Sequence, residues 1–330
     1  MSGFDLALRE ARLIGADEHG VVSALEGGVS SDICLVETKA RRFCVKRALA
    51  RLKVAADWRA PIERNRSEVE WMKVAAAIVP GAVPEILADR SQDGWFAMAY
   101  LEPAAHPLWK SELRDGRIDP EFAARVGATL VRIHAASAAD ASLPARFATD
   151  HIFGPIRLEP YLAATAEKHS DCAARLDALI AATRTNKKAL VHGDVSPKNI
   201  LIGPQGPVFL DAECAWWGDP AFDLAFCLNH LLLKGVWRMQ WKARYLESFD
   251  ALAHAYFRGV DWESVRELEA RVAGLLPGLL LARIDGKSPV EYITEESDRE
   301  RVRRIARRFL IEPVSTLAPI RVAWAQGEGA

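Results

Sequence analysis

One segment constrains the fold of this chain more than any other: LVHGDVSPKNIL, Leu190–Leu201, followed by VFLDAE, Val208–Glu213. Within it, the apolar runs Ile200–Ile202 and Val208–Leu210 are separated by the turn-forming residues GPQGP. Two short apolar runs on either side of a Gly/Pro turn predict a β-hairpin. A hairpin brings the residue before its first strand close to the residue after its second strand.

Three polar residues lie at the ends of the apolar runs. Asp194 follows the run Ala189–Val191, Asn199 precedes the first hairpin strand, and Asp211 follows the second. Because Asn199 and Asp211 are neighbours in a hairpin, both can present oxygen to one hard cation. Transfer of the terminal phosphoryl of a nucleotide needs such a metal site, and a carboxylate that orients and deprotonates the acceptor hydroxyl. The pattern therefore predicts Asp194 as the catalytic base and Asn199 and Asp211 as metal ligands.

The order of these motifs resembles the aminoglycoside phosphotransferase and choline kinase-like group. The resemblance is carried by HGD-x4-N from His192, then DAE, GDP and DLA, ending at Ala225. It implies a small-molecule kinase of protein-kinase-like fold that uses ATP and Mg²⁺. It also implies the same roles for Asp194, Asn199 and Asp211, and bracing of the catalytic loop by Asp219 and Asp223.

Three other residues of this segment are interpreted from their position. His192 is expected to support the loop through hydrogen bonds and not to act as the base. Lys198 is predicted to neutralise charge on the transferred phosphate, and a solvated loop lysine is the alternative. Glu213 is either close to the metal site or an exposed carboxylate.

A glycine-rich turn is predicted near the N-terminus. Strands at Val21–Leu25 and Ile33–Glu37 flank the sequence GGVSS, which ends at Ser31. Such a turn lets backbone amides approach phosphates closely. Gly28, Ser30 and Ser31 are therefore predicted to contact the nucleotide; an ordinary hairpin turn is the alternative.

A lysine and a glutamate are expected to complete the phosphate site. Phe43–Lys46 reads as a strand that ends in Lys46, and kinases use a lysine on this strand to grip the nucleotide phosphates. Its partner should lie on the helix predicted over Asn65–Val79. We choose Glu68, which borders the apolar face of that helix; Glu70 and Glu63 are the rivals.

The stretch WFAMAYLEP, which begins at Trp95, resembles a kinase hinge. The resemblance implies that Met98 lies at the back of a nucleotide pocket. It also implies that the backbone of Ala99 and Leu101 pairs with the base. An ordinary strand that enters a loop is the alternative.

The acceptor site is expected in the C-terminal half. Paired Trp216 and Trp217 could stack on a ring or a cationic group, with core packing as the alternative. Arg283 and Asp285 could bind polar groups of the acceptor; the alternative is that they lie on a charged surface turn. From Leu224 onward there are 16 Lys/Arg against 14 Asp/Glu, so charge does not support a polycationic antibiotic as acceptor.

The order of strands followed by helices predicts an α+β, bilobal, protein-kinase-like fold. Residues 1–101 would form a small β-rich nucleotide-binding lobe, and residues 102–330 a larger, mainly helical lobe for catalysis and substrate binding. Helices are expected at residues 4–14, from Pro120 to about Ala136, through Leu158–Thr183, and at about 220–234, 237–257, 262–283 and 294–311.

Composition limits the partners and the compartment. The net charge of −1 gives no reason to expect nucleic acid or an anionic membrane as partner. Five cysteines without metal spacing fit reduced thiols, and neither a signal peptide nor a membrane span is evident. The expectation is a cytoplasmic enzyme that acts on a small-molecule hydroxyl.

Two other functions fit the sequence less well. A protein kinase is disfavoured because no DFG or APE motif follows Asp211 and no room remains for a long activation segment before Gly218. A nucleotide-binding pseudokinase that acts as a scaffold or sensor should lack one of the residue types at Lys46, Asp194, Asn199 or Asp211. All four are present.

Overall fold

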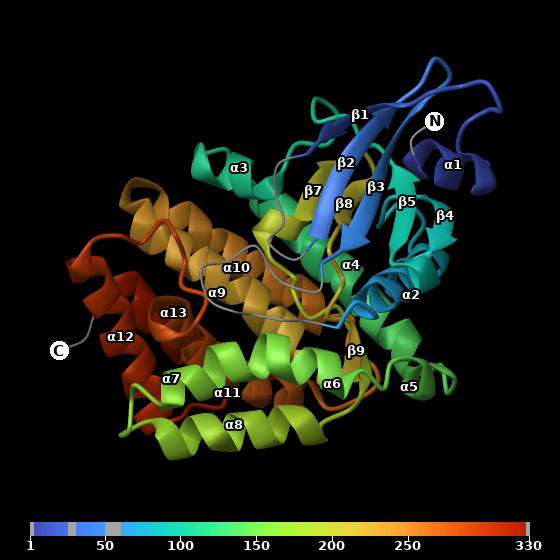
Figure 1. The fold of residues 1–330 in the computed structure, drawn as a ribbon. Coiled ribbons are helices and arrows are strands. Elements are labelled where there is room, and N and C mark those ends of the chain that lie inside the picture. The colour runs from blue at the N-terminus through green and yellow to red at the C-terminus, as the bar shows by residue number, and fades with distance from the viewer. Residues whose placement is uncertain (1–2, 26–30, 50–60, 328–330) are drawn as a thin grey trace.

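The structure is a computed structural model, and it describes residues 3–25, 31–49 and 61–327. It is an α+β molecule in which a β-sheet made by the N-terminal region lies beside a helical C-terminal region (Figure 1). This confirms the predicted fold class. The two described termini lie at opposite sides of the molecule, one at the sheet and one at the last helices.

The N-terminal sheet is antiparallel, with strand order β1-β2-β3-β5-β4. Within it, Cys44 on β3 is opposite Met98 on β5, and Ile33 on β2 is opposite Lys46. Lys46 therefore lies inside β3, whereas the sequence analysis placed it at the strand end. The strands of this sheet are β1 Val21–Ala24, β2 Ser31–Glu37, β3 Arg42–Ala48, β4 Ile86–Arg90 and β5 Trp95–Ala99.

Two strand boundaries in this region differ from the prediction. The strand expected over Val83–Ala88 begins at Ile86, because Pro84 has no backbone N–H to donate to a ladder. The strand expected to reach Leu101 ends at Ala99. The helix α2, Arg64–Ile78, agrees with the predicted Asn65–Val79 to within one residue and packs against the sheet.

Most of the predicted helices are present with shifted ends. Asp119 caps α4 as the sequence indicates, since its carboxylate accepts a hydrogen bond from the Glu121 amide and Pro120 takes the first helical position. The segment expected to be a helix through Leu158–Thr183 is instead a π-helical segment, η2, followed by two α-helices. Helix α13 was not predicted.

The helices are α1 Gly3–Glu10, α3 Trp109–Arg114, α4 Pro120–Ala138, α5 Leu143–Arg146, α6 Asp150–Phe153, η2 Gly154–Ala163, α7 Ala164–Ala166, α8 Ala173–Thr185, α9 Ala221–Trp237, α10 Lys242–Phe257, α11 Val265–Asp285, α12 Glu296–Ile311 and α13 Leu317–Gln326, with short 3-10 turns at η1 Ser91–Asp93, η3 Pro197–Asn199 and η4 Met239–Trp241.

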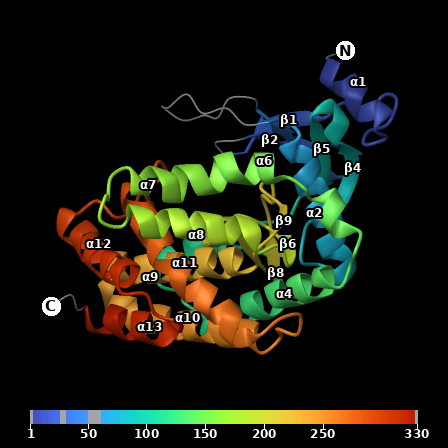
Figure 2. The same ribbon diagram turned by 90° about the horizontal axis from the view of Figure 1, so that it is seen from below.

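Helix α9 is the centre of the helical region. Every residue from Ala221 to Val236 is buried, and α10 and α11 pack along it (Figures 1 and 2). Next to it, α4 and α10 pack very closely at Gly127, where a Cβ would lie 2.3 Å from the carbonyl oxygen of Leu252. On the other side, α7 and the segment η2 run beside α8.

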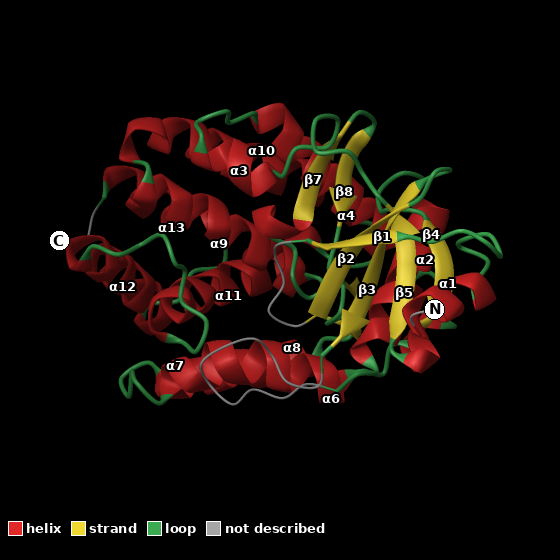
Figure 3. Ribbon diagram, turned by 45° about the horizontal axis from the view of Figure 1, so that its top comes forward, coloured by secondary structure: helices red, strands yellow, loops and turns green. Residues whose placement is uncertain are grey.

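The structure also has two small two-stranded sheets, β7–β8, which Figure 3 shows, and β6–β9, whose strands Figure 2 labels. Strands β7, Ile200–Gly203, and β8, Gly206–Phe209, are antiparallel neighbours, which confirms the predicted hairpin. Strand β6, Ala189–Val191, pairs with β9, Trp216–Gly218. The catalytic segment of the sequence therefore lies where the sheet meets the helical region.

Candidate active site

The β7–β8 hairpin places the two predicted metal ligands together. The amide of Leu210, next to Asp211, donates to the carbonyl of Asn199 at 2.9 Å. Asp211 has a left-handed backbone conformation, with φ of 65°. Residues other than glycine adopt this conformation at a cost, and such positions cluster at functional sites. The turn directs the Asp211 carboxylate toward β3 and α2.

Asp211 is part of a buried cluster with Lys46 and Glu68. The Lys46 ammonium donates to Glu68 at 2.8 Å and to Asp211 at 2.6 Å. Lys46 and Glu68 are each 2% exposed. The structure thus pairs Lys46 with Glu68, as the sequence analysis chose, and not with its rival Glu70, which contacts Lys73 and Arg146 at the surface.

The charges of Lys46 and Asp211 stabilise each other, whereas burial raises the pKa of Glu68 to about 7. Burial alone would lower the pKa of Lys46, but the negative charges of Asp211 and Glu68 outweigh it and raise the pKa. Burial acts to raise the pKa of Asp211, but the charges of Lys46 and Lys198 lower it below its usual range. At neutral pH this site therefore holds a protonated amine beside an ionised carboxylate, as phosphate binding through a metal requires.

A second ion pair connects α2 to the segment after Asp211. Arg64 donates from Nε to Glu213 at 2.9 Å and from Nη1 to the carbonyl of Pro61 at 2.9 Å. Glu213 is buried, so the alternative of an exposed carboxylate is wrong. The sequence analysis did not identify Arg64, since nothing in the local pattern links it to a residue 149 positions away.

The catalytic loop is held by hydrogen bonds to its backbone. The carboxylate of Asp223 accepts the amides of His192 at 2.7 Å and Gly193 at 2.8 Å. Gly193 has φ of 82°, and a Cβ there would lie 2.7 Å from the carbonyl oxygen of Cys214, so only glycine fits. Asp223 is in turn contacted by the buried His134, whose other ring nitrogen lies 2.6 Å from the hydroxyl of Tyr256.

His192 supports the same loop. Its Nδ1 accepts the amide of Asp194 at 3.1 Å, so the ring proton is on Nε2, which donates to the carbonyl of Leu210 at 3.1 Å. Burial lowers the pKa of His192, which keeps the ring neutral. His192 thereby ties the Asp194 loop to the Asp211 loop, in agreement with the predicted supporting role.

Asp194 is buried and is held by two cations. Its Oδ2 lies 2.8 Å from Nη2 of Arg157 and 3.1 Å from Nζ of Lys198. Burial acts to raise the pKa of Asp194, but the charges of Lys198 and Arg157 lower it below its usual value. An ionised carboxylate of low basicity orients a hydroxyl well and accepts its proton only late in the reaction.

Arg157 was not found by the sequence analysis. It lies in the π-helical segment η2, donates from Nε to the carbonyl of Gly193 at 2.5 Å, and is 6% exposed. Insertions of π-helix are rare and often occur at functional sites, but they have no reliable sequence pattern. Lys198, in contrast, was named by the sequence analysis. Its half-exposed side chain contacts Asp194, and its contact with the transferred phosphate stays a prediction.

The predicted metal ligand Asn199 has its side chain oriented by the catalytic loop. Its amide nitrogen donates to the carbonyl of Asp194 at 3.1 Å. The amide oxygen is thereby left as the group that can face a cation. Asn199 and Asp211 together offer only oxygen, the ligand type that Mg²⁺ prefers, and so fit the predicted metal.

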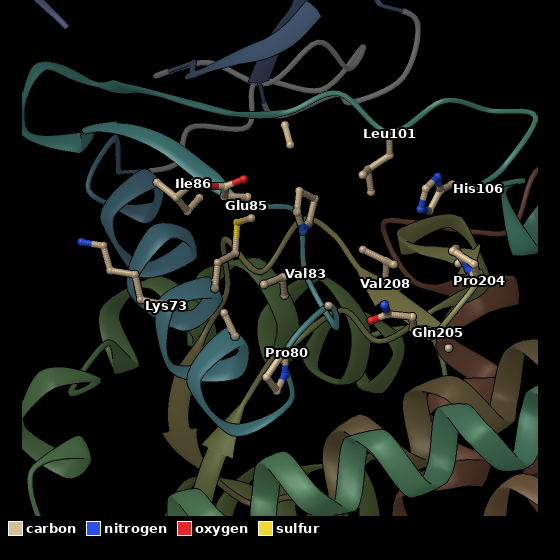
Figure 4. Close-up of a pocket in the computed structure, with 17 residues that line it drawn as sticks. Lys73, Pro80, Val83, Glu85, Ile86, Leu101, His106, Pro204, Gln205 and Val208 are labelled. Carbon is tan, nitrogen blue, oxygen red and sulfur yellow. The ribbon is translucent and has the colours of Figure 1, made fainter. Parts of the chain in front are cut away.

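The predicted hinge lies at the edge of a pocket of about 700 Å³ (Figure 4). Ala99 and Leu101 line this pocket together with Ile86, Val208 and His106, whereas neither Lys46 nor Asp194 does. The amide of Ala99 donates to the carbonyl of Glu85, so this amide is not available to a nucleotide base. The pocket is therefore behind the hinge and separate from the charged cluster.

The glycine-rich turn can be compared with the prediction only at its last residue. Gly28 and Ser30 lie outside the described residues. Ser31 begins β2, opposite Ala48, and is buried. Its contact with a nucleotide stays a prediction.

The predicted acceptor residues separate into different environments. Trp216 belongs to the core: it is 1% exposed and stacks on Phe153 with ring centroids 4.2 Å apart, so its assignment as a stacking surface for an acceptor is wrong. Trp217 is partly buried against the same core, which is the packing alternative. Trp216 is covered by α6, since its partner Phe153 is the last residue of that helix.

Arg283 and Asp285, near the end of α11, also differ from each other. Both carboxylate oxygens of Asp285 accept hydrogen bonds from Arg303 at 2.9 Å, and one of them lies 2.9 Å from His169. The carboxylate therefore joins α12 to α11 and is not available to a phosphoryl acceptor. Arg283 is buried, so it is not on a charged surface turn. It donates to Ser288 and lies over the Tyr161 ring.

The comparisons with known proteins agree with this geometry. The model of the "Phosphotransferase enzyme family" matches residues 21–268, three quarters of the chain. The matched range includes the site residues described above except Arg283 and Asp285, with their partners Ser288 and Arg303. The chain belongs to the phosphotransferase enzyme family.

Individual relatives of this phosphotransferase are more distant. A methylthioribose kinase of Escherichia coli O45:K1 (strain S88 / ExPEC) is 26% identical over 262 residues, covering 69% of this chain and 61% of its own length. The chain thus spans less than two thirds of that relative.

Solved structures resemble the phosphotransferase in fold. The choline kinase of Cryptosporidium parvum Iowa II has a TM-score of 0.59 at 12% identity over 94% of this chain and 96% of its own. The amicoumacin kinase hAmiN, solved with AMP-PNP, Ca²⁺ and Ami, has a TM-score of 0.57 at 12% identity over 95% of each chain. Among the described residues, no helix is both long and apolar enough to cross a membrane.

Proposed function

We propose that this phosphotransferase moves the γ-phosphoryl of ATP to a hydroxyl of a small molecule, with Mg²⁺ as cofactor. One observation carries the proposal. Lys46, Glu68 and Asp211 form a buried ion-paired cluster, although Lys46 and Asp211 are 165 residues apart in the chain. Burying three charges is costly unless they are paired, so such a cluster indicates a site with a charged ligand.

The nucleotide would lie between two lobes, residues 1–101 and residues 102–330. The Ala99 carbonyl and the Leu101 amide would meet the base, with Met98 behind it. Lys46 would bind the phosphates, and the turn with Gly28, Ser30 and Ser31 would cover them. The AMP-PNP complex of the amicoumacin kinase supports a nucleotide donor for this fold.

The metal would be held by Asn199 and Asp211. A Mg²⁺ ion held by these two side chains would supply positive charge that offsets the charge developing on the phosphates. The two side chains supply oxygen from the two ends of one hairpin, so the site's geometry depends on the β7–β8 register. In the present arrangement Asp211 contacts Lys46, a contact that phosphate oxygens would share.

Asp194 would orient the acceptor hydroxyl in line with the γ-phosphorus. A bond forms between the acceptor oxygen and phosphorus, the bond from phosphorus to the β–γ bridging oxygen breaks, and ADP leaves. The hydroxyl proton passes to Asp194 late, since Arg157 and Lys198 stabilise its ionised form. Positioned proton transfer typically contributes about 10²–10⁴-fold to a rate.

The test is ADP release from ATP with and without Mg²⁺, against a panel of amino alcohols, sugars, methylthioribose and aminoglycosides. Turnover that depends on both the acceptor and Mg²⁺, and is absent in Asp194→Asn, is expected. Tight ATP binding with no turnover across the panel would contradict the proposal and favour a nucleotide-binding scaffold.

A further inference from the structure

A group of buried basic side chains lies at the far end of α9. It consists of His230 and Lys234 on α9 and Arg283 on α11, called here the α9–α11 cationic cluster. Burial and the neighbouring cations lower the pKa of His230 well below its usual value, so its ring is neutral, and Lys234 and Arg283 supply the positive charge. The three residues are 6%, 1% and 8% exposed. Within the described part of the chain, His230 Nε2, Lys234 Nζ and Arg283 Nε have no hydrogen-bond partner.

Unpaired buried donors of this kind are rare. Nearly all buried polar side-chain atoms in proteins have a partner, and a buried ammonium without one is especially costly. The hydroxyl of Tyr292, whose ring lies 4.5 Å from Lys234 Nζ, is also without a partner among the described residues. Three donors, on Lys234, Arg283 and Tyr292, and one imidazole nitrogen, on His230, have no partner in one region, which indicates an acceptor that comes from outside the chain.

Aromatic contacts connect the segment η2 to the cluster. Tyr161 lies 5.5 Å from Phe226, and Phe226 lies 5.5 Å from His230, measured between ring centroids. Phe226, His230 and Lys234 are spaced by four residues, so they share one face of α9. The same helix begins near Asp223, which holds the catalytic loop through its backbone amides.

The distance from the loop to the cluster suits a small molecule. With a rise of 1.5 Å per residue, His230 lies on the order of 10 Å along the axis from Asp223. Lys198, which contacts Asp194, is among the cations that act electrostatically on His230. Lys198 is therefore near enough to the cluster for its charge to act on His230.

Other charges near the cluster are mostly positive. Lys110, Arg114 and Arg238 act on Lys234 in addition to the cluster itself, and one carboxylate, Glu291, opposes them. Glu291 is paired with Lys110 in an exposed ion pair. The local excess of positive charge is thus not neutralised by Glu291.

We propose that the phosphoryl acceptor carries an oxyanion, a phosphate or a carboxylate, that binds to the α9–α11 cationic cluster while its hydroxyl lies at Asp194. The inference rests on the proposed function for the hydroxyl end of the acceptor. The donors His230, Lys234, Arg283 and Tyr292 supply the hydrogen bonds to the anion. The accepted class is a hydroxylated acid or phosphate ester, not an amino alcohol or a polycation.

The first experiment measures anion binding without turnover. Thermal unfolding is recorded with inorganic phosphate, acetate or chloride at constant ionic strength. Wild type should be stabilised by phosphate or acetate relative to chloride. Lys234→Met should lose this stabilisation, and Lys234→Arg should keep most of it.

A matched control is Lys187→Met. Lys187 also lies over an aromatic ring, 5.8 Å from the Trp216 centroid, but its charge is paired with Asp150. This variant should respond to the anions as wild type does. No stabilisation of wild type, or equal stabilisation of Lys234→Met, overturns the inference, because the anion then binds elsewhere or not at all.

The second experiment distinguishes the anion and separates the two proposals. Glucose, glucose 6-phosphate and glucuronate differ only in the group at C6, and ADP release is measured for each, with methylthioribose as a second neutral acceptor. The anionic members should have kcat/KM at least about 10-fold higher than the neutral ones, the range of one charged hydrogen bond. Lys234→Met should raise KM for the better anion with little change in kcat.

The outcomes separate the two proposals. Turnover that is equal or better with neutral acceptors overturns the inference and leaves the proposed function intact. Anion binding that depends on Lys234, without ATP turnover of any acceptor, supports the anion site and contradicts the proposed function. A phosphate preference over a carboxylate, or the reverse, identifies which oxyanion the cluster accepts.

Discussion

The catalytic cleft and the far end of α9 both gather buried charged side chains, but they differ in how those charges are paired. In the cleft, Lys46 contacts two carboxylates, and Asp194 contacts two cations. In the α9–α11 cationic cluster, Lys234 has aromatic rings around it and no hydrogen-bond partner among the described residues.

This difference separates two ways of building a binding site. A cleft with paired charges is stable without its ligand and holds its groups in position for the reaction. A cluster with unpaired charges lowers the stability of the free protein, and an oxyanion restores the missing partner on binding. The four predictions below test the comparison, and they run from the largest expected effect to the smallest.

The largest effect is expected in the cleft. Asp194→Asn should lower kcat by about 10²–10⁴-fold because it removes the proton acceptor, while ATP binding stays near the wild-type value. Single-turnover kinetics and calorimetric titration with ATP and Mg²⁺ measure the two quantities. A variant that retains wild-type turnover would show that Asp194 has a structural role only.

At the far end of α9, Lys234→Met should raise the free energy of unfolding. Burial and the neighbouring cations lower the pKa of Lys234 to about 8, from 10.5 in the unfolded chain. The protonated side chain is therefore penalised on folding, by up to about 3 kcal/mol at 1.36 kcal/mol per pKa unit.

The pH dependence gives the sign of this effect. The penalty is fully present below pH 8 and vanishes above pH 10.5, so the advantage of Lys234→Met should shrink as the pH rises between these values. Chemical denaturation at pH 7 and pH 10 measures it. An advantage that is the same at both pH values would contradict an unpaired ammonium at this site.

A smaller effect tests whether the cleft charges act as a pair. Glu68→Gln leaves Lys46 with Asp211 alone, so kcat/KM for ATP should fall roughly 10–100-fold, the range of one charged hydrogen bond. Glu70→Gln, two residues further along α2, is the matched control; its surface ion pairs should matter by no more than about 0.5 kcal/mol. Equal losses in both variants would disprove the assignment of Glu68.

The smallest effect concerns Arg157. Because its charge helps lower the pKa of Asp194, Arg157→Met should raise that pKa, and the acidic limb of the kcat/KM profile should move up by about 1 pH unit. Activity would then be lost at a higher pH than in wild type. Arg157→Lys should restore most of the shift; an unmoved limb in Arg157→Met would mean that Lys198 alone sets the pKa.

Much of the fold was predictable because its signals are local. The hairpin over Ile200–Phe209 follows from two apolar runs and a Gly/Pro turn, and α4 follows from Asp119 and Pro120 with an apolar stripe behind them. The boundaries were less accurate. The helix expected from residue 237 begins at Lys242 after a 3-10 turn, and α13 was missed, because helix ends depend on packing as well as on capping.

The candidate site was predictable only where a motif marks it. Asp194, Asn199 and Asp211 lie within one short segment whose spacing carries information. Arg157 and Arg64 were not predictable, since each depends on which distant element packs against it. For Trp216 the sequence left both core packing and acceptor stacking open, and the structure decided for core packing. The local sequence pattern around a charged helix residue does not show whether its side chain faces solvent or a buried carboxylate.

By itself, the sequence determined the α+β order, the hairpin with its polar ends and the residue types of the catalytic segment, because backbone sterics, turn residues and periodicity act over a few neighbours. Only the tertiary structure decided that Lys46 pairs with Glu68 and that Arg157 holds Asp194. It also decided that His230, Lys234 and Arg283 each have a nitrogen without a hydrogen-bond partner in the described part of the chain. Electrostatic pairing depends on distance in space, and that distance is set by how helices and strands far apart in the chain pack together.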